Sequence, residues 1–260
     1  KVDGYFITHN GQHHRIGGST SADMPTVDIP QRPTRAFEDE VLQKEIEAAA
    51  RSLAIGLPVI IDGEPGTGKS ELARKIHDEA FDNSSLTVID CRLLTTDNFE
   101  SYLFGAEGMI GFFDPDSGQN SKGKLPLARG GSVLFRNAQT LDKAIQSRIS
   151  DVMTFEDERR RDGITPVITG WLFVGPSSWM DDPEFDIAPA FSNSIDGKMV
   201  TAPPLSQRSD FHKVASAIIA DISQEHSLSP VALSILQEES WPGNLKQLRK
   251  TIQHAVAQAS

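Results

Sequence analysis

The pattern of apolar and polar positions divides the chain into an α/β part and a purely helical part. Five short apolar runs, rich in β-branched residues, predict strands: residues 57–62, 86–90, 132–135, 168–175 and 198–202. Segments with helical spacing alternate with them: residues 69–80, residues 96–104 and the stripe of Leu141, Ile145, Ile149 and Val152. Strands that alternate with helices predict a parallel sheet covered by helices on both faces.

One amphipathic helix is predicted before the first strand, and three helices after the last. The first carries apolar residues at helical spacing: Phe37, Val41, Leu42, Ile46, Ala49 and Leu53. After Pro203 one stripe consists of Phe211, Val214, Ala215, Ile218 and Ile222. Ser229 and Pro230 predict the cap and first residue of the next helix. A turn at residues 241–244 leads into the last, whose inner face carries Leu245, Leu248 and Ile252.

The N-terminal residues predict a small hairpin and a linker. Residues 5–9 and 12–16 flank Asn10-Gly11, a strong two-residue turn signal. His9, His13 and His14 surround this turn, but no carboxylate or cysteine completes a metal site, so we expect a solvated hairpin. Residues 17–34 are rich in Gly, Ser, Pro and Thr. We therefore expect a hairpin and linker at 1–34, an α/β domain at 35–204 and a helical lid at 205–260.

In two segments the apolar residues recur with no clear helical or strand periodicity. Residues 109–124 contain Gly, Asp and Phe and predict a loop or an inserted hairpin. Residues 156–162 form a charge run that includes Arg159, Arg160 and Arg161. We expect this run to be a solvated helix end rather than a phosphate-binding patch.

Composition and charge narrow the function. The net charge of −11 argues against binding of nucleic acid by these residues, so a DNA-binding module would lie outside them. No apolar run is long enough for a membrane span. The single cysteine, Cys91, excludes an internal disulfide and fits a reducing cytoplasm. Because the chain starts at Lys1 without a signal peptide, we expect an internal fragment of a longer cytoplasmic protein.

Residues 63–70 carry the clearest chemistry. They read Gly-Glu-Pro-Gly-Thr-Gly-Lys-Ser and match the G-x-x-x-x-G-K-[ST] motif, between a predicted strand and a predicted helix. In such a loop backbone N–H groups surround a β-phosphate, the lysine reaches the β/γ oxygens and the serine binds Mg²⁺. The helix N-terminus adds positive potential. The sequence therefore predicts a triphosphate-binding fold.

Five segments together resemble the central AAA+ domain of bacterial enhancer-binding proteins, the NtrC-like activators of sigma-54 RNA polymerase. Their order and spacing agree with the family: residues 63–70, 100–105, 130–135, 203–208 and 241–245. The resemblance runs from about residue 37 to the C-terminus. It implies a P-loop α/β core followed by a small all-α lid. The family usually continues into a helix-turn-helix module, which these residues do not include.

The family's third strand ordinarily ends in Asp-Glu, an acid that orients Mg²⁺ and one that activates water. This chain has Arg136 and Asn137 there, and Asp90 replaces the asparagine that restrains the glutamate. Arginine offers no acceptor to a metal ion, and asparagine cannot take a proton. We therefore assign no catalytic residue.

Two further motifs depart from the family pattern. The family's GAFTGA loop, which contacts sigma-54, corresponds to residues 109–114, where Phe112 fills the threonine position. Ser177 and Ser178 follow Pro176 where a threonine–asparagine sensor is usual. These departures from the family pattern predict a domain that acts independently of sigma-54.

The arginines that the family offers to a neighbouring subunit's γ-phosphate are also missing. Their positions, counted back from Pro203, hold Ala188 and Ser194. Lys246 occupies the position of the lid's sensor arginine and keeps a cation near the phosphates.

We therefore expect a regulatory AAA+ domain of a bacterial transcription factor that binds ATP or ADP and hydrolyses it poorly or not at all. The residues expected to bind nucleotide are Gly63, Glu64, Gly66, Thr67, Gly68, Lys69, Ser70, Glu71 and Lys246, with Ser70 also facing any Mg²⁺. Cyclic di-GMP is an alternative ligand that no motif supports. The expected partners are RNA polymerase or other transcription proteins, and a second copy of the chain is a further option.

Two other functions remain open. An active ATPase would have to recruit Glu107, Asp114 or Asp116 in place of the missing acids, although loop carboxylates are more often solvated than catalytic. A P-loop kinase for a small molecule is disfavoured by the helical lid and by the lack of an acid to bind Mg²⁺. An ATPase assay and an assay of phosphoryl transfer separate these functions.

Overall fold

The computed structural model describes residues 6–9, 12–15, 39–82, 84–105, 108–113 and 123–259. Its centre is a five-stranded sheet in the order β4-β5-β6-β3-β7, and every pairing in it is parallel. The strands are β3 (Val59–Asp62), β4 (Leu86–Asp90), β5 (Ser132–Arg136), β6 (Gly170–Val174) and β7 (Lys198–Thr201). The predicted parallel sheet is thus confirmed, with strand ends within two residues of those expected.

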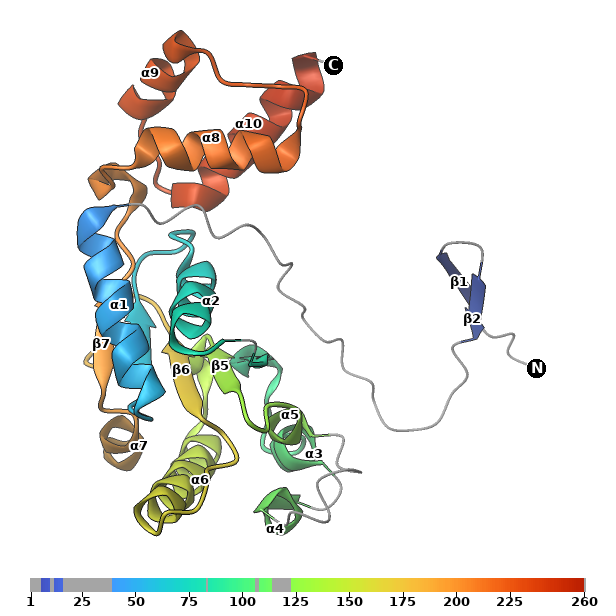
Figure 1. Cartoon of the computed structure of the whole chain (residues 1–260), viewed down its shortest axis with the longest axis vertical. Helices are drawn as coiled ribbons and strands as arrows, with labels where there is room; N and C mark the ends of the chain where they lie inside the picture. Colours follow the sequence, from blue (N-terminus) through green and yellow to red (C-terminus); the bar gives the residue numbers. More distant parts are fainter. Residues whose placement is uncertain are drawn as a thin grey trace.

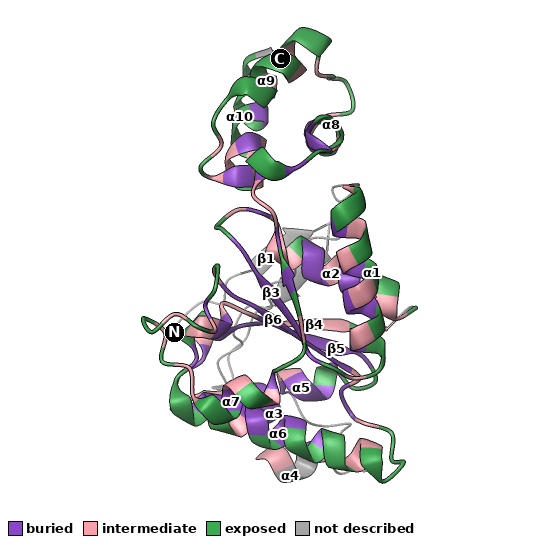
Figure 2. Ribbon diagram, turned by 90° about the vertical axis from the view of Figure 1, so that its left-hand side faces the viewer, coloured by how far each residue is buried: buried purple, intermediate pink, exposed green. Residues whose placement is uncertain are grey.

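Helices cover both faces of the sheet, as Figures 1 and 2 show. One face packs against α1 (Glu40–Ala54) and α2 (Lys69–Ala80). The other face carries a second group of helices: α3 (Phe99–Phe104), α4 (Gly108–Phe113), α5 (Lys124–Leu127), α6 (Lys143–Arg161) and α7 (Pro189–Ser194). Because successive strand residues point to opposite faces, the strands β3 to β6 supply both cores, whereas the edge strand β7 supplies one through Val200. In β5, Leu134 joins the first core, while Val133 and Phe135 join the second.

A separate helical lid follows the sheet. It consists of α8 (Phe211–Ile222), α9 (Pro230–Glu238) and α10 (Asn244–Ala259), which enclose their own apolar core. The Ser229 hydroxyl accepts a hydrogen bond from the Ala232 amide at 3.1 Å, so the predicted cap of α9 is present. Ser209, just before α8, donates to Asp39, the residue that caps α1. This contact joins the start of the lid to the start of the α/β domain.

Three short helical turns complete the regular structure: Cys91–Leu93 after β4, Ala138–Thr140 after β5 and Leu205–Gln207 before the lid. At the N-terminus, β1 (Phe6–His9) and β2 (Gln12–Arg15) pair antiparallel as the hairpin prediction requires. The predicted linker and turn residues lie outside the described residues.

The prediction for residues 109–124 was wrong at both ends. Helix α4 covers Gly108–Phe113, and α5 begins at Lys124. Residues 114–122 lie outside the described part of the chain. The predicted helix at 96–104 begins only at Phe99, because residues 96–98 form a turn.

Candidate functional site

The P-loop connects the end of β3 to the start of α2. Gly66 and Gly68 adopt φ angles of 83° and 89°, a left-handed conformation that favours glycine. A Cβ atom on Gly66 would also lie 2.3 Å from the carbonyl oxygen of Gly243 in the lid. No side chain caps the N-terminus of α2. The first amides of this helix are therefore available to an anion, as the motif predicts.

Lys69 lies folded over the loop itself. Its Nζ donates to the carbonyl oxygens of Gly63 and Glu64, each at 2.7 Å. The Thr67 hydroxyl donates to the same Glu64 carbonyl at 3.0 Å. Burial lowers the pKa of Lys69, while the nearby Asp62 and Glu64 carboxylates oppose that shift. The loop is thus shaped in advance, and its cation rests on backbone carbonyls that an incoming phosphate can replace.

A cleft of about 1430 Å³ opens between this loop and the lid. Six of the residues predicted to bind nucleotide line it: Gly66, Gly68, Lys69, Ser70, Glu71 and Lys246. The other three, Gly63, Glu64 and Thr67, form the loop without lining the cleft. The cleft wall is strongly basic, although the chain as a whole is acidic. Its cations are Lys69, Arg92, Arg136, Lys213, Lys246 and Arg249, against Glu71 and Asp221 as its acids.

Asn244 joins the lid to the loop, a role that the motif alone did not reveal. Its side-chain nitrogen donates to a Glu64 carboxylate oxygen at 3.0 Å and to the Pro65 carbonyl at 3.2 Å. Its side-chain oxygen accepts from the Leu205 amide at 2.7 Å. The residue is buried and has a φ of 49° at the start of α10. The position of the lid is therefore tied directly to the shape of the loop.

The carboxyl ends of β4 and β5 lie on the same edge of the sheet, because Asp90 pairs with Arg136 in the parallel register. Asn137 donates its side-chain amide to Asp90 at 2.9 Å, and Arg92 contacts both oxygens of the same carboxylate at 2.9 and 2.5 Å. Burial alone would raise the pKa of Asp90, but the hydrogen bonds from Arg92 and Asn137 outweigh it and lower the pKa. Asp90 is therefore an anion that its two neighbours already satisfy.

The segment after β6 turns toward β3. The Ser178 amide donates to Asp62 at 3.0 Å, and Ser178 has a φ of 54°. The second carboxylate oxygen of Asp62 is buried and has no hydrogen-bond partner among the described residues. Asp62 itself does not line the cleft.

The two positions that the resemblance assigns to arginines face the interior of the domain. The Ala188 amide donates to Gln146 at 2.7 Å, and the Ser194 hydroxyl lies 2.9 Å from the Ser150 hydroxyl of α6. Gln146 is fully buried. Both residues are half-buried and short, and neither carries a guanidinium group.

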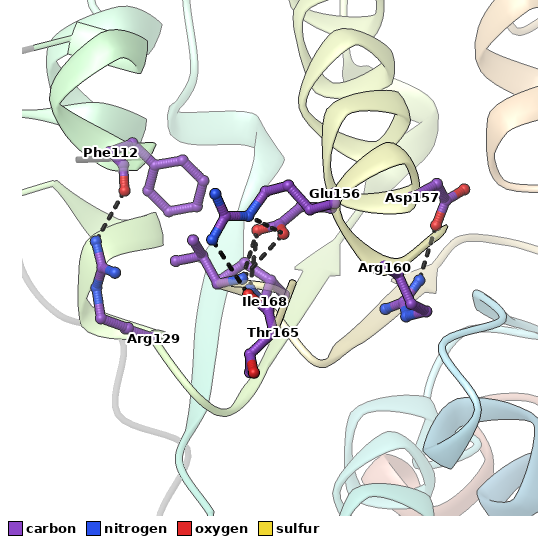
Figure 3. A network of polar contacts seen from close by, with 9 residues as sticks. Phe112, Arg129, Glu156, Asp157, Arg160, Thr165 and Ile168 are labelled. Carbon is purple, nitrogen blue, oxygen red and sulfur yellow. Dashed lines mark hydrogen bonds and ion pairs between the residues drawn. The ribbon is translucent and has the colours of Figure 1, made fainter. Parts of the chain in front are cut away.

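The segment at the GAFTGA position is packed into the core. Phe112 is fully buried, and its carbonyl oxygen accepts a hydrogen bond from Arg129 at 2.8 Å (Figure 3). Its ring centroid lies 6.1 Å from that of Phe104 and 4.6 Å from that of Phe113. Phe113 in turn lies 4.2 Å from Phe155 of α6. Helix α4 is therefore held against the domain by two aromatic contacts, to Phe104 and Phe155, and by one hydrogen bond from Arg129.

The prediction of a solvated helix end at residues 156–162 was wrong for its first residue. Glu156 is fully buried and accepts hydrogen bonds from the Val167 and Ile168 amides at 2.9 to 3.0 Å (Figure 3). Burial raises the pKa of Glu156, and the amides and Arg159 oppose that shift. The carboxylate thus satisfies two amides of the segment that leads into β6.

Other candidates are excluded or lie outside the described residues. Where side chains are described, no group of three His, Cys, Asp or Glu residues could hold a metal ion. Glu107, Asp114 and Asp116, the acids that an active ATPase would need, fall outside the described residues. Over the described ranges, no helix combines the length and apolar character needed to cross a membrane.

Comparison with known sequences agrees with this architecture. Residues 36–163 match the family model described as the Sigma-54 interaction domain. The chain is 27% identical to the acetoin catabolism regulatory protein of Cupriavidus necator, over 84% of this chain and 34% of that protein. It is 30% identical to the anaerobic nitric oxide reductase transcription regulator NorR of Escherichia coli, over 84% of this chain and 44% of that protein. It spans between a third and two thirds of the length of these and similar curated relatives.

Solved structures share the fold. NtrX from Brucella abortus in complex with ADP matches with a TM-score of 0.65 at 20% identity, over 84% of this chain and 49% of that one. The same protein in complex with ATP matches with a TM-score of 0.62 at 21% identity, over 92% and 53%. At these identities the likeness supports the fold alone. Together with the sequence matches, it identifies an α/β P-loop AAA+ fold in which residues 36–163 match the Sigma-54 interaction domain of bacterial transcription regulators.

Proposed function

We propose that this domain binds ATP or ADP as part of a bacterial transcription regulator, hydrolyses it poorly or not at all, and acts without sigma-54. One observation carries the proposal. The P-loop motif is complete, whereas the ends of β4 and β5 offer Arg136 and an Asp90–Asn137 pair in place of a free carboxylate.

Several features support nucleotide binding. The loop glycines have the required backbone conformation, the N-terminus of α2 has no side-chain cap, and Lys69 lies at the cleft. NtrX, which has the same fold, is described with ADP and with ATP. Binding of this kind uses backbone groups and one lysine, so it does not need the residues that this chain lacks.

The rate contributions of the missing catalytic groups are large enough to support poor hydrolysis. A positioned general base contributes about 10²–10⁴ in rate, and an arginine supplied in trans about 10³–10⁵. Asn137 cannot accept a proton, and Ala188 and Ser194 make inward contacts instead of presenting a guanidinium. Because such groups act as a unit, loss of both leaves turnover near background.

The packing of α4 supports independence from sigma-54. A contact loop must expose its side chains, yet Phe112 is fully buried and Arg129 binds its carbonyl. The proposed partners are therefore other transcription proteins, among them RNA polymerase or a second copy of the chain. A stable complex with sigma-54, trapped with a transition-state mimic of ATP, would contradict this part of the proposal.

The test compares the wild-type chain with Lys69→Ala. Removing the charged contact should weaken ATP and ADP binding by about 1.5–3 kcal/mol, measured by calorimetric titration. Phosphate release should be equally low in both proteins. Equal affinity in the two would show that the loop does not bind nucleotide. Phosphate release well above the variant's would show an active ATPase.

A further inference from the structure

In a loop of this motif the serine hydroxyl is a ligand for the Mg²⁺ that accompanies a triphosphate, so the donor set of the cleft can be tested against that ion. Mg²⁺ requires near-octahedral oxygen ligands and is held by one or two carboxylates besides phosphate and water. The cleft provides the Ser70 hydroxyl, but the strand end opposite it provides Arg136, a cation with no acceptor atom.

The nearby acidic residues do not supply the carboxylate ligand that is missing opposite Ser70. Asp90 is bound by Arg92 and Asn137, and Asp221 of α8 forms an ion pair with Arg249. Asp62 accepts the Ser178 amide and lies away from the cleft wall. Glu71 is exposed in the first turn of α2. Among the described residues, Glu71 is therefore the one carboxylate of the cleft wall without a described partner, and the strand end opposite Ser70 provides a cation, so this donor set fits a magnesium site poorly.

Two cations of the cleft have no described partner. The side chains of Arg136 and Lys246 form no hydrogen bond or ion pair with any described residue. Arg136 is half-buried at the end of a central strand, where an unpaired guanidinium is costly to desolvate. A third cation of the cleft, Lys69, donates hydrogen bonds to carbonyl oxygens and not to a carboxylate of any described residue. The three enter the cleft from β5, from α10 and from the start of α2.

We propose that this cleft binds the polyphosphate of a nucleotide without a metal ion, with Arg136 supplying the charge that Mg²⁺ supplies elsewhere. The inference rests on the proposed nucleotide binding and specifies its ligand as a free nucleoside di- or triphosphate. A triphosphate carries about four negative charges at neutral pH, and Arg136, Lys69 and Lys246 offset three of them. A guanidinium suits this task because it donates two parallel hydrogen bonds to phosphate oxygens.

The experiment is a calorimetric titration of the whole chain with ATP and with ADP, once in Mg²⁺ and once in EDTA. The wild-type affinity in EDTA should equal or exceed that in Mg²⁺. Arg136→Asp should lower the affinity in EDTA at least tenfold, and Mg²⁺ should restore part of it. Arg161→Asp, the same charge change on the exposed end of α6, should leave both affinities unchanged.

The outcomes separate this inference from the proposed function. No binding in either buffer would contradict the proposed function itself. Binding by the wild type only in Mg²⁺ would overturn the metal-free inference and leave nucleotide binding intact. Unchanged affinity of Arg136→Asp in EDTA would overturn it as well. If Arg136→Asp does not fold, Arg136→Gln keeps the test open, with an expected loss of about tenfold in EDTA.

Discussion

Two regions on the carboxyl-terminal side of the sheet differ in how many of the family's residues they contain. At β3 the chain has the glycine loop, the lysine and the uncapped helix that bind phosphate in P-loops. Two and three strands away, the ends of β5 and β4 carry Arg136, Asn137 and Asp90 at the positions that the resemblance assigns to the residues of hydrolysis. The first region works through backbone amides, and the second through individual side chains. Substitutions can therefore remove hydrolysis without disturbing binding.

The largest effect is expected where the loop meets the lid. Gly66→Ala forces an alanine to a φ of 83° and places its Cβ 2.3 Å from the Gly243 oxygen. Strain and contact together should cost about 3 kcal/mol and abolish nucleotide binding. Gly163→Ala is the matched control, because Gly163 has a φ of 73° but no atom within 4 Å of the added Cβ. It should cost about 1 kcal/mol in urea denaturation and leave binding unchanged. Equal losses in both variants would show that contact with the lid is unimportant.

Removal of the link between lid and loop should have the next largest effect. Asn244→Ala deletes two hydrogen bonds to the loop and leaves the buried Leu205 amide without its acceptor. We expect a loss of about 2 kcal/mol in unfolding free energy and faster proteolysis between α7 and α8. Ser234→Ala, which removes one exposed hydroxyl bond within α9, serves as the control. A proteolysis pattern identical to the wild type would contradict the coupling of loop and lid.

A smaller effect should follow from restoring the family's glutamate alone. Asn137→Glu replaces the donor to Asp90 with a second carboxylate, so repulsion and a lost hydrogen bond should cost about 1–2 kcal/mol. The double variant Asp90→Asn with Asn137→Glu pairs an amide with an acid again. It should recover more than half of that loss in urea denaturation. If the effects of the two substitutions on the unfolding free energy are additive, the hydrogen bond between the two residues contributes nothing to stability.

The smallest effect concerns pH. Because hydrogen bonds hold the pKa of Asp90 below its ordinary 3.8, its stabilisation is present above that value and lost as pH falls through the lowered pKa. Arg92 is largely exposed, so the contribution should stay below about 1 kcal/mol. The difference in unfolding free energy between wild type and Asp90→Asn should shrink as pH falls from 5 to 3, values about one unit either side of the ordinary pKa. A difference that stays constant over this range would contradict the assignment.

Much of the fold followed from local pattern. The helix at residues 69–80 was predicted with its observed ends, because the motif fixes where the loop stops and the helix starts. The strands were recognisable because each is a continuous apolar run. Helix α4 was missed because six residues with glycines and no flanking period carry little local signal.

The site was less predictable, because its contacts join distant residues. Asp90 and Asn137 lie 47 positions apart, and only the strand register brings them together. Asn244 contacts residues 180 and 179 positions away, which depends on where the lid sits. Glu156 did leave a signal, since it continues the apolar spacing of Ile145, Ile149 and Val152 along α6. A charged residue in line with a buried stripe should be read as buried.

The Asp90–Asn137 pair also bears on how such a domain evolves. The family's asparagine and glutamate are here replaced by an acid and an amide in exchanged places, and the hydrogen bond between them is present. Asn137→Glu made alone sets two carboxylates against each other, whereas Asp90→Asn made alone leaves two amides that can still hydrogen-bond but loses the charged contact with Arg92. Arg136 adds a third change, because a magnesium ligand must replace it as well. If the proposed loss of hydrolysis is correct, restoring it requires several substitutions whose single steps are less stable, and this coupling between positions opposes reversal.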